Sequence, residues 1–281
     1  MMNMSEYEAK LEIAKQILES LCNKELSHSE LEDMVYDFFR VRKSREEKSE
    51  FLNNYDSYKL IPYSKYGFAR NIDKKKCLSR EDNYWLRFLF NHKSDFHYKI
   101  PKQGSDIELY YKAYFTLKAE NPEEFKKNYE RLGMALPEII AFLYALGIVN
   151  KDEIQAKVSN NPYKMYTTRD NLVVHCRKPE TVKQAIAGIN HILEKYGTKI
   201  EIHHGFDFYN NGSKFEGSHT QLISRIISRR LLMNIDDYTL ISPENLASFI
   251  LSQNDELSRM SPLNLYAQLK MTQGENFEEI Q

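Results

Sequence analysis

Two short basic segments are the residues of this chain best suited to chemistry. One is Tyr110-Tyr-Lys112-Ala-Tyr114-Phe-Thr-Leu117, and the other places Lys157 twelve residues before Arg169 and leads on to His175. Lysine and arginine side chains on neighbouring strands bind phosphate groups, arginine through its planar fork and lysine as a compact charge. The two segments therefore indicate a pocket for a phosphorylated group, provided that the fold brings their strands together.

Lys157 is the residue in this set that could act as a base. It stands between Ala156 and Val158 in a segment that reads as a half-buried strand. A lysine on the inward side of a strand has its pKa lowered by desolvation, which frees the amine to accept a proton. The alternative is an outward-facing side chain whose ammonium group reaches water. The same alternative applies to Lys112 and Arg169.

Other histidines and arginines could complete such a site. His203 and His204 stand at the end of a predicted strand, where a solvated pair is the alternative to a catalytic one. The arginines of a later predicted helix could clamp a phosphate, or could only complement the helix dipole near its last turns. These are Arg225, Arg229 and Arg230.

Helical periodicity dominates the first part of the chain. Residues 5–22 repeat apolar positions at helical spacing, and Ser29 with Glu32 opens a second helix toward Phe39, which predicts a helical hairpin. The mixed charges of residues 40–48 are interpreted as a solvated helix end. Residues 50–78 are expected to be loop with a short strand, and Ser79–Phe90 a short helix.

Strands and helices alternate after residue 107. The expected strands are 109–117, 153–158, 171–177 and 199–203, and the expected helices are 121–132, 137–146, 180–196, 218–233 and two that start at Ser242 and Ser261. The helix at 137–146 is apolar nearly all round and should be buried. The pattern predicts an α+β fold with a mixed, mostly antiparallel sheet flanked by helices. It also predicts an N-terminal mostly helical region over 1–100 and an α+β domain over 101–281.

Composition removes several classes of function. Lys+Arg 39 against Asp+Glu 40 gives a net charge of -1, so no global field attracts nucleic acid or an anionic membrane. Cys22, Cys77 and Cys176 have no metal-ligand spacing and do not suggest a disulfide framework. We find no GxGxxG, Walker, HExxH or GxSxG motif, no signal peptide, and no apolar run approaching the roughly 20 residues of a membrane span. These observations favour a soluble protein with a local anion site.

The spacing of the two basic segments resembles the HopA-type effector family over about 107–232. Tyr111-Lys-Ala-Tyr114-Phe-Thr-Leu117 is followed, after a long helical stretch, by Lys157-Val-Ser-Asn-Asn-Pro-Tyr and Arg169-Asp-Asn-Leu-Val-Val-His175. Gly217-Ser-His-Thr-Gln-Leu-Ile-Ser-Arg225-Ile-Ile fits a further block of the family loosely. The spacing agrees better than the residue identities do.

That family looks like a distant relative of the phosphothreonine lyase effectors and of the lyase components of lanthipeptide and thioamitide synthetases. Those enzymes remove phosphate from phosphothreonine or phosphoserine by β-elimination, and the resemblance implies no metal and no cofactor. It makes Lys157 the base, and Lys112 and Arg169 phosphate ligands, with Arg225 and Arg229 or Arg230 completing the clamp. Tyr114 stands where the lyases have an acidic histidine.

This departure puts turnover in question, because a phenol with an ordinary pKa of about 10 is a weaker acid than imidazolium. Tyr114 takes over the role, or His175 or His204 supplies the acid, or elimination is lost. The sequence thus carries two main hypotheses. One is a phosphothreonine or phosphoserine lyase, in the bacterial cytoplasm or delivered into a host cell. The other is a non-catalytic effector or phosphopeptide-binding module, and an adaptor without an anion site is the third reading. Expected partners are a phosphorylated peptide or protein, with no nucleic acid and no membrane, and the oligomeric state is open.

Overall fold

The structure is a computed structural model that describes residues 4–23, 27–54, 78–81, 85–90, 107–210, 216–233 and 242–272. The chain divides into two compact units. One is continuous, Arg45–Glu216, and the other combines Met1–Ser44 with Gly217–Gln281. The boundary expected between residues 100 and 101 lies outside the described residues.

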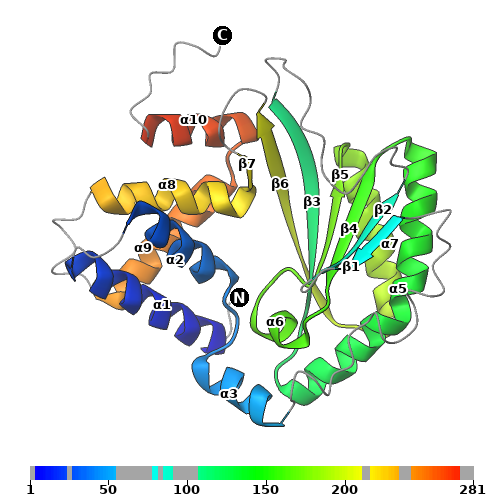
Figure 1. Cartoon of the computed structure of the whole chain (residues 1–281), viewed down its shortest axis with the longest axis horizontal. Coiled ribbons are helices and arrows are strands. Elements are labelled where there is room, and N and C mark those ends of the chain that lie inside the picture. The colour runs from blue at the N-terminus through cyan, green and yellow to red at the C-terminus, as the bar shows by residue number, and fades with distance from the viewer. Residues whose placement is uncertain are drawn as a thin grey trace. The chain divides into compact units, whose positions relative to one another are not determined.

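An antiparallel sheet is the centre of the continuous unit (Figure 1). In the described residues the strand order is β1-β2-β4-β5-β3-β6-β7, and each strand pair from β1 to β6 is antiparallel. The predicted α+β class is therefore confirmed. The strands are β1 (Leu78–Glu81), β2 (Trp85–Phe90), β3 (Ile107–Leu117), β4 (Ile154–Ser159), β5 (Leu172–Cys176), β6 (Ile200–Asn210) and β7 (Glu216–Ser218).

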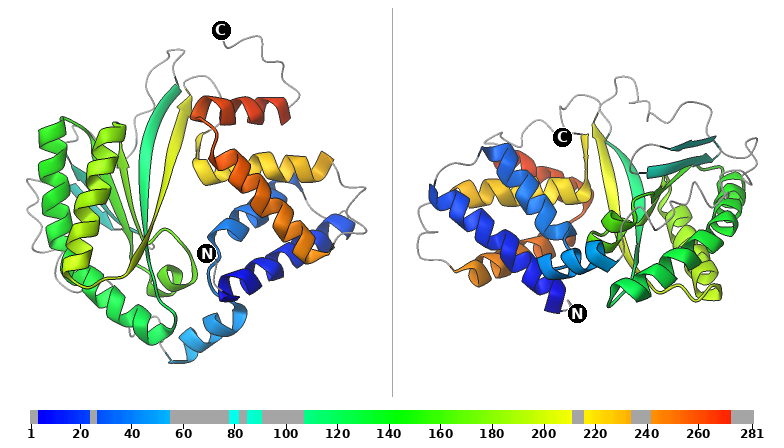
Figure 2. Two further views of the ribbon diagram at one scale, coloured as in Figure 1. Left: turned by 180° about the vertical axis from the view of Figure 1, so that it is seen from behind. Right: turned by 60° about the horizontal axis from the view of Figure 1, so that its bottom comes forward.

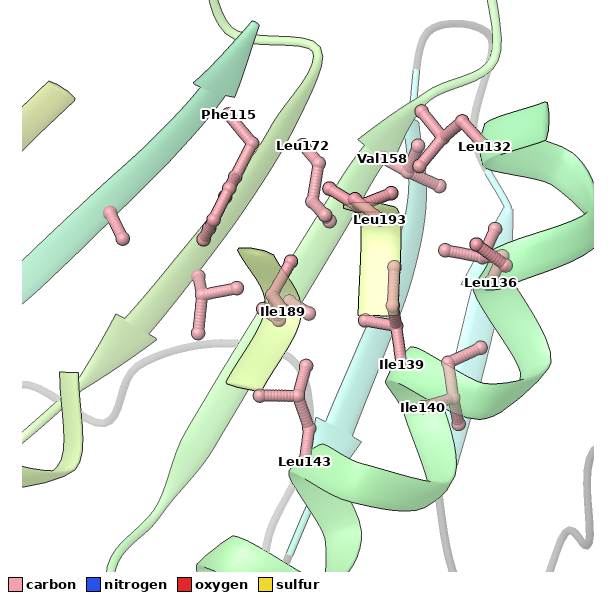
Figure 3. Packing of buried hydrophobic residues seen from close by; sticks show 14 of the residues in the cluster. Phe115, Leu132, Leu136, Ile139, Ile140, Leu143, Val158, Leu172, Ile189 and Leu193 are labelled. Atoms are coloured by element: carbon pink, nitrogen blue, oxygen red, sulfur yellow. The ribbon is translucent and has the colours of Figure 1, made fainter. Parts of the chain in front are cut away.

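One face of the sheet is apolar and packs against two helices. Alternate strand residues such as Phe88, Val158 and Phe115 belong to this face and are buried. They pack against α5 (Pro122–Asn150) and α7 (Pro179–Lys195), which lie side by side on the sheet (Figures 1 and 2). Leu136, Ile139 and Leu143 of α5 meet Ile189 and Leu193 of α7 in this core (Figure 3). The polar residues of these strands therefore lie mainly on the opposite face of the sheet.

The prediction of two helices over 121–146 is wrong, because α5 is a single helix of 29 residues. Asn121 caps its start, as expected, by accepting a hydrogen bond from the Glu124 amide at 2.9 Å. Pro137 lies inside the helix, which is bent along its length in both views (Figures 1 and 2). A proline need not end a helix whose apolar face is buried on both sides of it.

The outer side of α5 also departs from the expectation of full burial. Ala141, Ala145, Ile148 and Val149 are exposed. Among the described helices, α5 is long and apolar enough over 18 residues to cross a membrane by length and composition alone. However, 44% of that window is buried inside the protein. The helix therefore has the burial pattern of a core helix with one uncovered side.

Three buried polar residues connect the elements around the sheet. Asp152 accepts hydrogen bonds from the Arg177 and Lys178 amides at the start of α7, at 3.2 and 3.0 Å. Asn128 of α5 donates to the Lys118 carbonyl at 2.6 Å. Asn171 follows the short helix α6 (Pro162–Thr167) and is fully buried. These side chains satisfy backbone groups at element ends, where the ladder hydrogen bonds stop.

The second unit is helical. It contains α1 (Met4–Asn23), α2 (His28–Arg40), α8 (His219–Met233), α9 (Pro243–Ser258) and α10 (Pro262–Thr272). The predicted N-terminal hairpin is present, with α1 and α2 in contact. Ser27, rather than the expected Ser29, caps α2 in a capping box with Glu30. The C-terminal helices begin at the predicted prolines.

Two sequence expectations between residues 40 and 90 are wrong. The 79–90 segment is not a helix, because its described residues form β1 and the alternating strand β2. Residues 41–44 are buried rather than a solvated helix end. They lead into α3 (Arg45–Asn54), whose Phe51 stacks on Tyr166 with ring centroids 4.7 Å apart. In both segments, tertiary packing overrides the local charge pattern.

Candidate functional site

The polar face of the sheet gathers the basic residues of four strands. In β2 and β4, Arg87 is the register partner of Lys157. In β5 and β3, His175 is the partner of Lys112. Register partners on antiparallel strands project to the same face, and so do residues two positions apart on one strand. Lys157 pairs with Val173, two residues before His175, so all four residues share one face. We call Arg87, Lys157, His175 and Lys112 the basic cluster.

Alternation along each strand separates this cluster from the hydrophobic core. Ala156 and Val158 flank Lys157, and both belong to the buried core cluster beneath the sheet. The Lys157 side chain therefore does not point into the hydrophobic core. Its side chain is on the face opposite the core, and the residue is partly exposed.

Burial within the cluster is uneven. Lys112 is 6% exposed and His175 4% exposed, whereas Lys157 and Arg87 are partly exposed. A buried lysine costs free energy unless its charge is compensated. The cluster thus has a buried half on β3 and β5 and a more accessible half on β2 and β4.

The pKa of the His175 imidazole shows how the charges of the cluster act together. Its pKa lies well below the ordinary value, because burial desolvates the ring and because Lys112, Lys157 and Arg87 are positively charged. A hydrogen bond with the Gln155 backbone opposes this effect without cancelling it. The His175 imidazole is therefore neutral at pH 7. The charges of all three basic side chains act on this one ring.

Aromatic rings accompany both lysines. The Lys157 ammonium lies 4.5 Å from the centroid of the Trp85 ring, and the Lys112 ammonium lies 5.8 Å from that of Tyr114. A cation near an aromatic ring is attracted to its quadrupole. These rings hold the ammonium groups on the polar face without neutralising their charge.

Gly205 of β6 determines where the Tyr114 ring lies. The register pairs Lys112 with Gly205 and Tyr114 with His203, so Gly205 and Tyr114 are diagonal neighbours. A Cβ atom at position 205 would lie 2.9 Å from Tyr114 Cε2 and 3.5 Å from its hydroxyl. The ring therefore extends across the β6 backbone, in space that only glycine leaves open.

Tyr114 shares the polar face with the basic cluster, because it is two positions from Lys112 on β3. His203 is on this face too, with Nε2 3.4 Å from the Glu201 carboxylate. His204 pairs with Ala113 and projects to the other face. Of the alternative acids considered from the sequence, His175 is thus on the same face as Lys112 and Lys157, and His204 is on the opposite face.

Arg169 lies in the connection between α6 and β5. The twelve-residue spacing from Lys157 consists of the end of β4, the helix α6 and the turn into β5. The Asn171 carbonyl accepts a hydrogen bond from the Ser159 amide, which places Arg169 beyond the end of β4. The assignment of Arg169 as a phosphate ligand remains a prediction.

Arg225, Arg229 and Arg230 belong to α8, in the other unit. Arg225 forms a bidentate ion pair with Glu32 of α2, with N–O distances of 2.9 and 3.0 Å. Arg229 donates to His28 Nε2 at 3.3 Å, and Arg230 donates to Gln253 and Gln268. All three have partners within the helical unit, and their expected role in a phosphate clamp also stays a prediction.

Metal binding and chemistry at the Cys176 thiol have little support in the described part of the chain. Its His, Cys, Asp and Glu residues form no group of three or more that could hold a metal ion. Cys176 is buried on the apolar side, and burial raises the pKa of its thiol far above the ordinary value. Such a thiol is a packing residue.

Arg87 and Gly205 were not predicted from the sequence. Arg87 was missed because its segment was interpreted as a helix, although Trp85, Arg87 and Leu89 alternate with Leu86, Phe88 and Phe90. That alternation predicts a strand with Arg87 on the less buried side. Gly205 offers no local signal, since its role depends on a ring from another strand.

Comparisons with known proteins add one finding. No protein-family model and no curated protein matches the sequence. A solved structure, the effector protein from Pseudomonas syringae pv. syringae strain 61, is similar with a TM-score of 0.38 and 10% identity. The match covers 88% of this chain and 98% of that one. A TM-score of this size does not establish a common family.

Proposed function

We propose that the polar face of the sheet binds the phosphate group of a phosphothreonine or phosphoserine residue in a peptide. The observation that carries the proposal is the basic cluster, in which the charges of Lys112, Lys157 and Arg87 act together on the buried His175. A dianion at this point would be attracted by all three positive charges. Arginine and lysine together provide both a planar fork and a point charge for its oxygens.

The same geometry supports β-elimination as the reaction. Lys157, after its ammonium group releases a proton to water, would take the proton from Cα of the phosphorylated residue. The electron pair of that C–H bond would form the Cα=Cβ double bond, and the Cβ–O bond would break with its electrons on the phosphate oxygen. The products are a dehydroamino acid and inorganic phosphate. Lys112 and Arg87 would stabilise the charge that develops on the leaving phosphate.

A phosphopeptide-binding module that does not turn over is the second candidate. The neutral state of His175 favours it, because a neutral imidazole at pH 7 donates a proton less readily than imidazolium. Tyr114 is a further candidate proton donor on this face. Binding requires only the cations, whereas elimination also requires a proton donor or a phosphate that leaves unprotonated.

Two measurements test the proposal. Binding is measured by calorimetry with a phosphothreonine peptide and its unphosphorylated twin, for the wild type and for Arg87→Ala with Lys112→Ala. The double variant should bind at least about tenfold more weakly, since each charge-assisted contact contributes roughly 1.5–3 kcal/mol. The matched control is Lys195→Ala, which removes an exposed lysine of α7 that pairs with Glu138 of α5. Equal affinity for both peptides would disprove phosphate recognition.

Turnover is measured by mass spectrometry of the same peptide after prolonged incubation. Loss of phosphoric acid that disappears in Lys157→Ala, but persists in Lys199→Ala, would support elimination. Lys199 is a suitable control because its ammonium is engaged by Glu124 at 2.6 Å outside the cluster. Binding without any dehydrated product would leave the binding module as the function.

A further inference from the structure

His175 occupies the position in the basic cluster with the most cationic neighbours. Lys112 of β3 and Gln155 of β4 are its direct register partners, and Lys157 is two register pairs further along β4. Arg87 acts on it from β2, and Tyr114 shares its face from β3. At 4% exposure, water screens little of this interaction.

The protonation state of such a group depends on what else is present. A proton on His175 would add a positive charge near those of Lys112, Lys157 and Arg87 in a desolvated site. In a site that water screens so little, a nearby charge acts strongly on the ring. A phosphate dianion beside the ring would therefore oppose the repulsion that keeps it neutral.

We propose that His175 binds a proton when a phosphate group enters the basic cluster, and that the resulting imidazolium is the acid for the leaving phosphate. This inference rests on the proposed function. His175 takes one proton from water on binding. In the elimination step it returns that proton to the phosphate oxygen as the Cβ–O bond breaks, while Lys157 keeps the proton from Cα. The bound phosphate thus generates an imidazolium acid, which is a stronger proton donor than the phenol of Tyr114.

Proton uptake can be measured directly by calorimetry. Inorganic sulfate and a phosphothreonine peptide are titrated at pH 7.5 in two buffers with different ionisation enthalpies, and the difference gives the number of protons bound. Sulfate is the decisive probe because it carries no titratable proton near this pH. For both ligands we expect a net uptake of up to one proton per site in the wild type. His175→Gln should reduce the uptake to near zero, whereas His203→Gln, a histidine on the same face outside the cluster, should not change it.

Nitrogen NMR supplies a readout that is independent of binding heats. The ring nitrogens of His175 should move from the shifts of a neutral tautomer to those of imidazolium as sulfate saturates the site. If sulfate and the phosphopeptide bind but His175 stays neutral and no proton is taken up, the inference is wrong while the proposed function stands. If neither ligand binds, both fail.

Discussion

At the scale of single residues, a glycine and a histidine decide what the polar face can do. Gly205 leaves room for the Tyr114 ring, and His175 concentrates the influence of three cations. Both effects depend on neighbours from other strands. The role of each residue can be tested by a substitution that preserves the strand and changes a single side chain.

Gly205→Ala should displace the Tyr114 ring while leaving the sheet intact. The added Cβ would meet Cε2 at 2.9 Å, and the far end of a side chain can move at low cost. We expect the free energy of unfolding to change by less than about 1 kcal/mol, since alanine also gains over glycine in a strand. Fluorine NMR of 3-fluorotyrosine at position 114 should show a shifted resonance.

The binding of a phosphopeptide provides a second test of this contact. We expect Gly205→Ala to change the affinity severalfold in the wild-type background and not at all in a Tyr114→Leu background. His204→Ala, on the adjacent residue but the opposite face, is the matched control. Equal effects in both backgrounds would show that Gly205 does not act through the ring.

The lowered pKa of His175 also predicts how stability depends on pH. The folded protein binds this proton less readily than the unfolded chain, so the stabilisation is complete above the ordinary pKa of about 6.5 and is lost as the pH falls below it. One such group contributes a slope of up to about 1.4 kcal/mol per pH unit. Urea denaturation between pH 7.5 and 5 should show a shallower pH dependence in His175→Gln than in the wild type. Identical slopes would contradict the burial of a neutral imidazole.

At the scale of elements, the β4–α6–β5 connection is held by one side chain. Asn171 accepts a hydrogen bond from the Leu117 amide of β3 at 2.7 Å and donates to the Met165 carbonyl of α6 at 2.9 Å. It therefore joins the turn between α6 and β5 to β3, whose Leu117 lies 54 residues earlier in the chain. The geometry of the segment that carries Lys157 and Arg169 depends on it.

Asn171→Ala should destabilise the continuous unit by about 2–4 kcal/mol, because buried backbone groups lose their partners. Thermal and chemical denaturation followed by circular dichroism would measure the loss. Asn190→Ala, which removes an exposed side chain bonded to Glu194, should cost less than about 0.5 kcal/mol. A similar loss in both variants would exclude the proposed role of Asn171.

The sequence predicts many of these elements correctly, for reasons visible in individual residues. Asn121 with Pro122 sets the start of α5, and Val182, Ile189 and Leu193 recur at helical spacing in α7. It fails where a local signal competes with packing. Pro137 suggested a helix end, yet the core on both sides holds α5 together. The alternating segment of β2 has only six residues, and periodicity over so short a segment does not exclude a helix.

At the scale of the whole molecule, the helical unit is assembled from both ends of the chain. Residues 1–44 and 217–281 pack into one unit, joined by contacts of α1 with α9 and of α2 with α8. Arg225 and Glu32, 193 residues apart, form the bidentate pair between α2 and α8. Neither segment buries its apolar face without the other.

Deletion of residues 1–44 should therefore unfold α8, α9 and α10 and leave the sheet unit folded. Leu222, Ile226 and Leu231 of α8 are fully buried in the intact protein and would face water. We expect a loss of helical circular dichroism, with a persisting cooperative transition from residues 45–216. Hydrogen exchange would locate the unprotected amides.

Glu32→Ala is a smaller change than this deletion, because it removes only the ion pair with Arg225. It should lower the stability of the helical unit alone. Protected amides throughout 217–281 after the deletion would show instead that the C-terminal helices fold alone.

By itself, the sequence determined the helices with strong caps and periodicity, the alternating strands, and the residue types for an anion site. Periodicity and capping are local, so a few neighbouring residues suffice to specify them. Only the tertiary structure decided that β2 lies beside β4 and β3 between β5 and β6. That order brings Arg87, Lys157, His175 and Lys112 together and places Gly205 beside Tyr114. Strand order is set by the free energy of packing the whole core, which no short segment of the chain encodes.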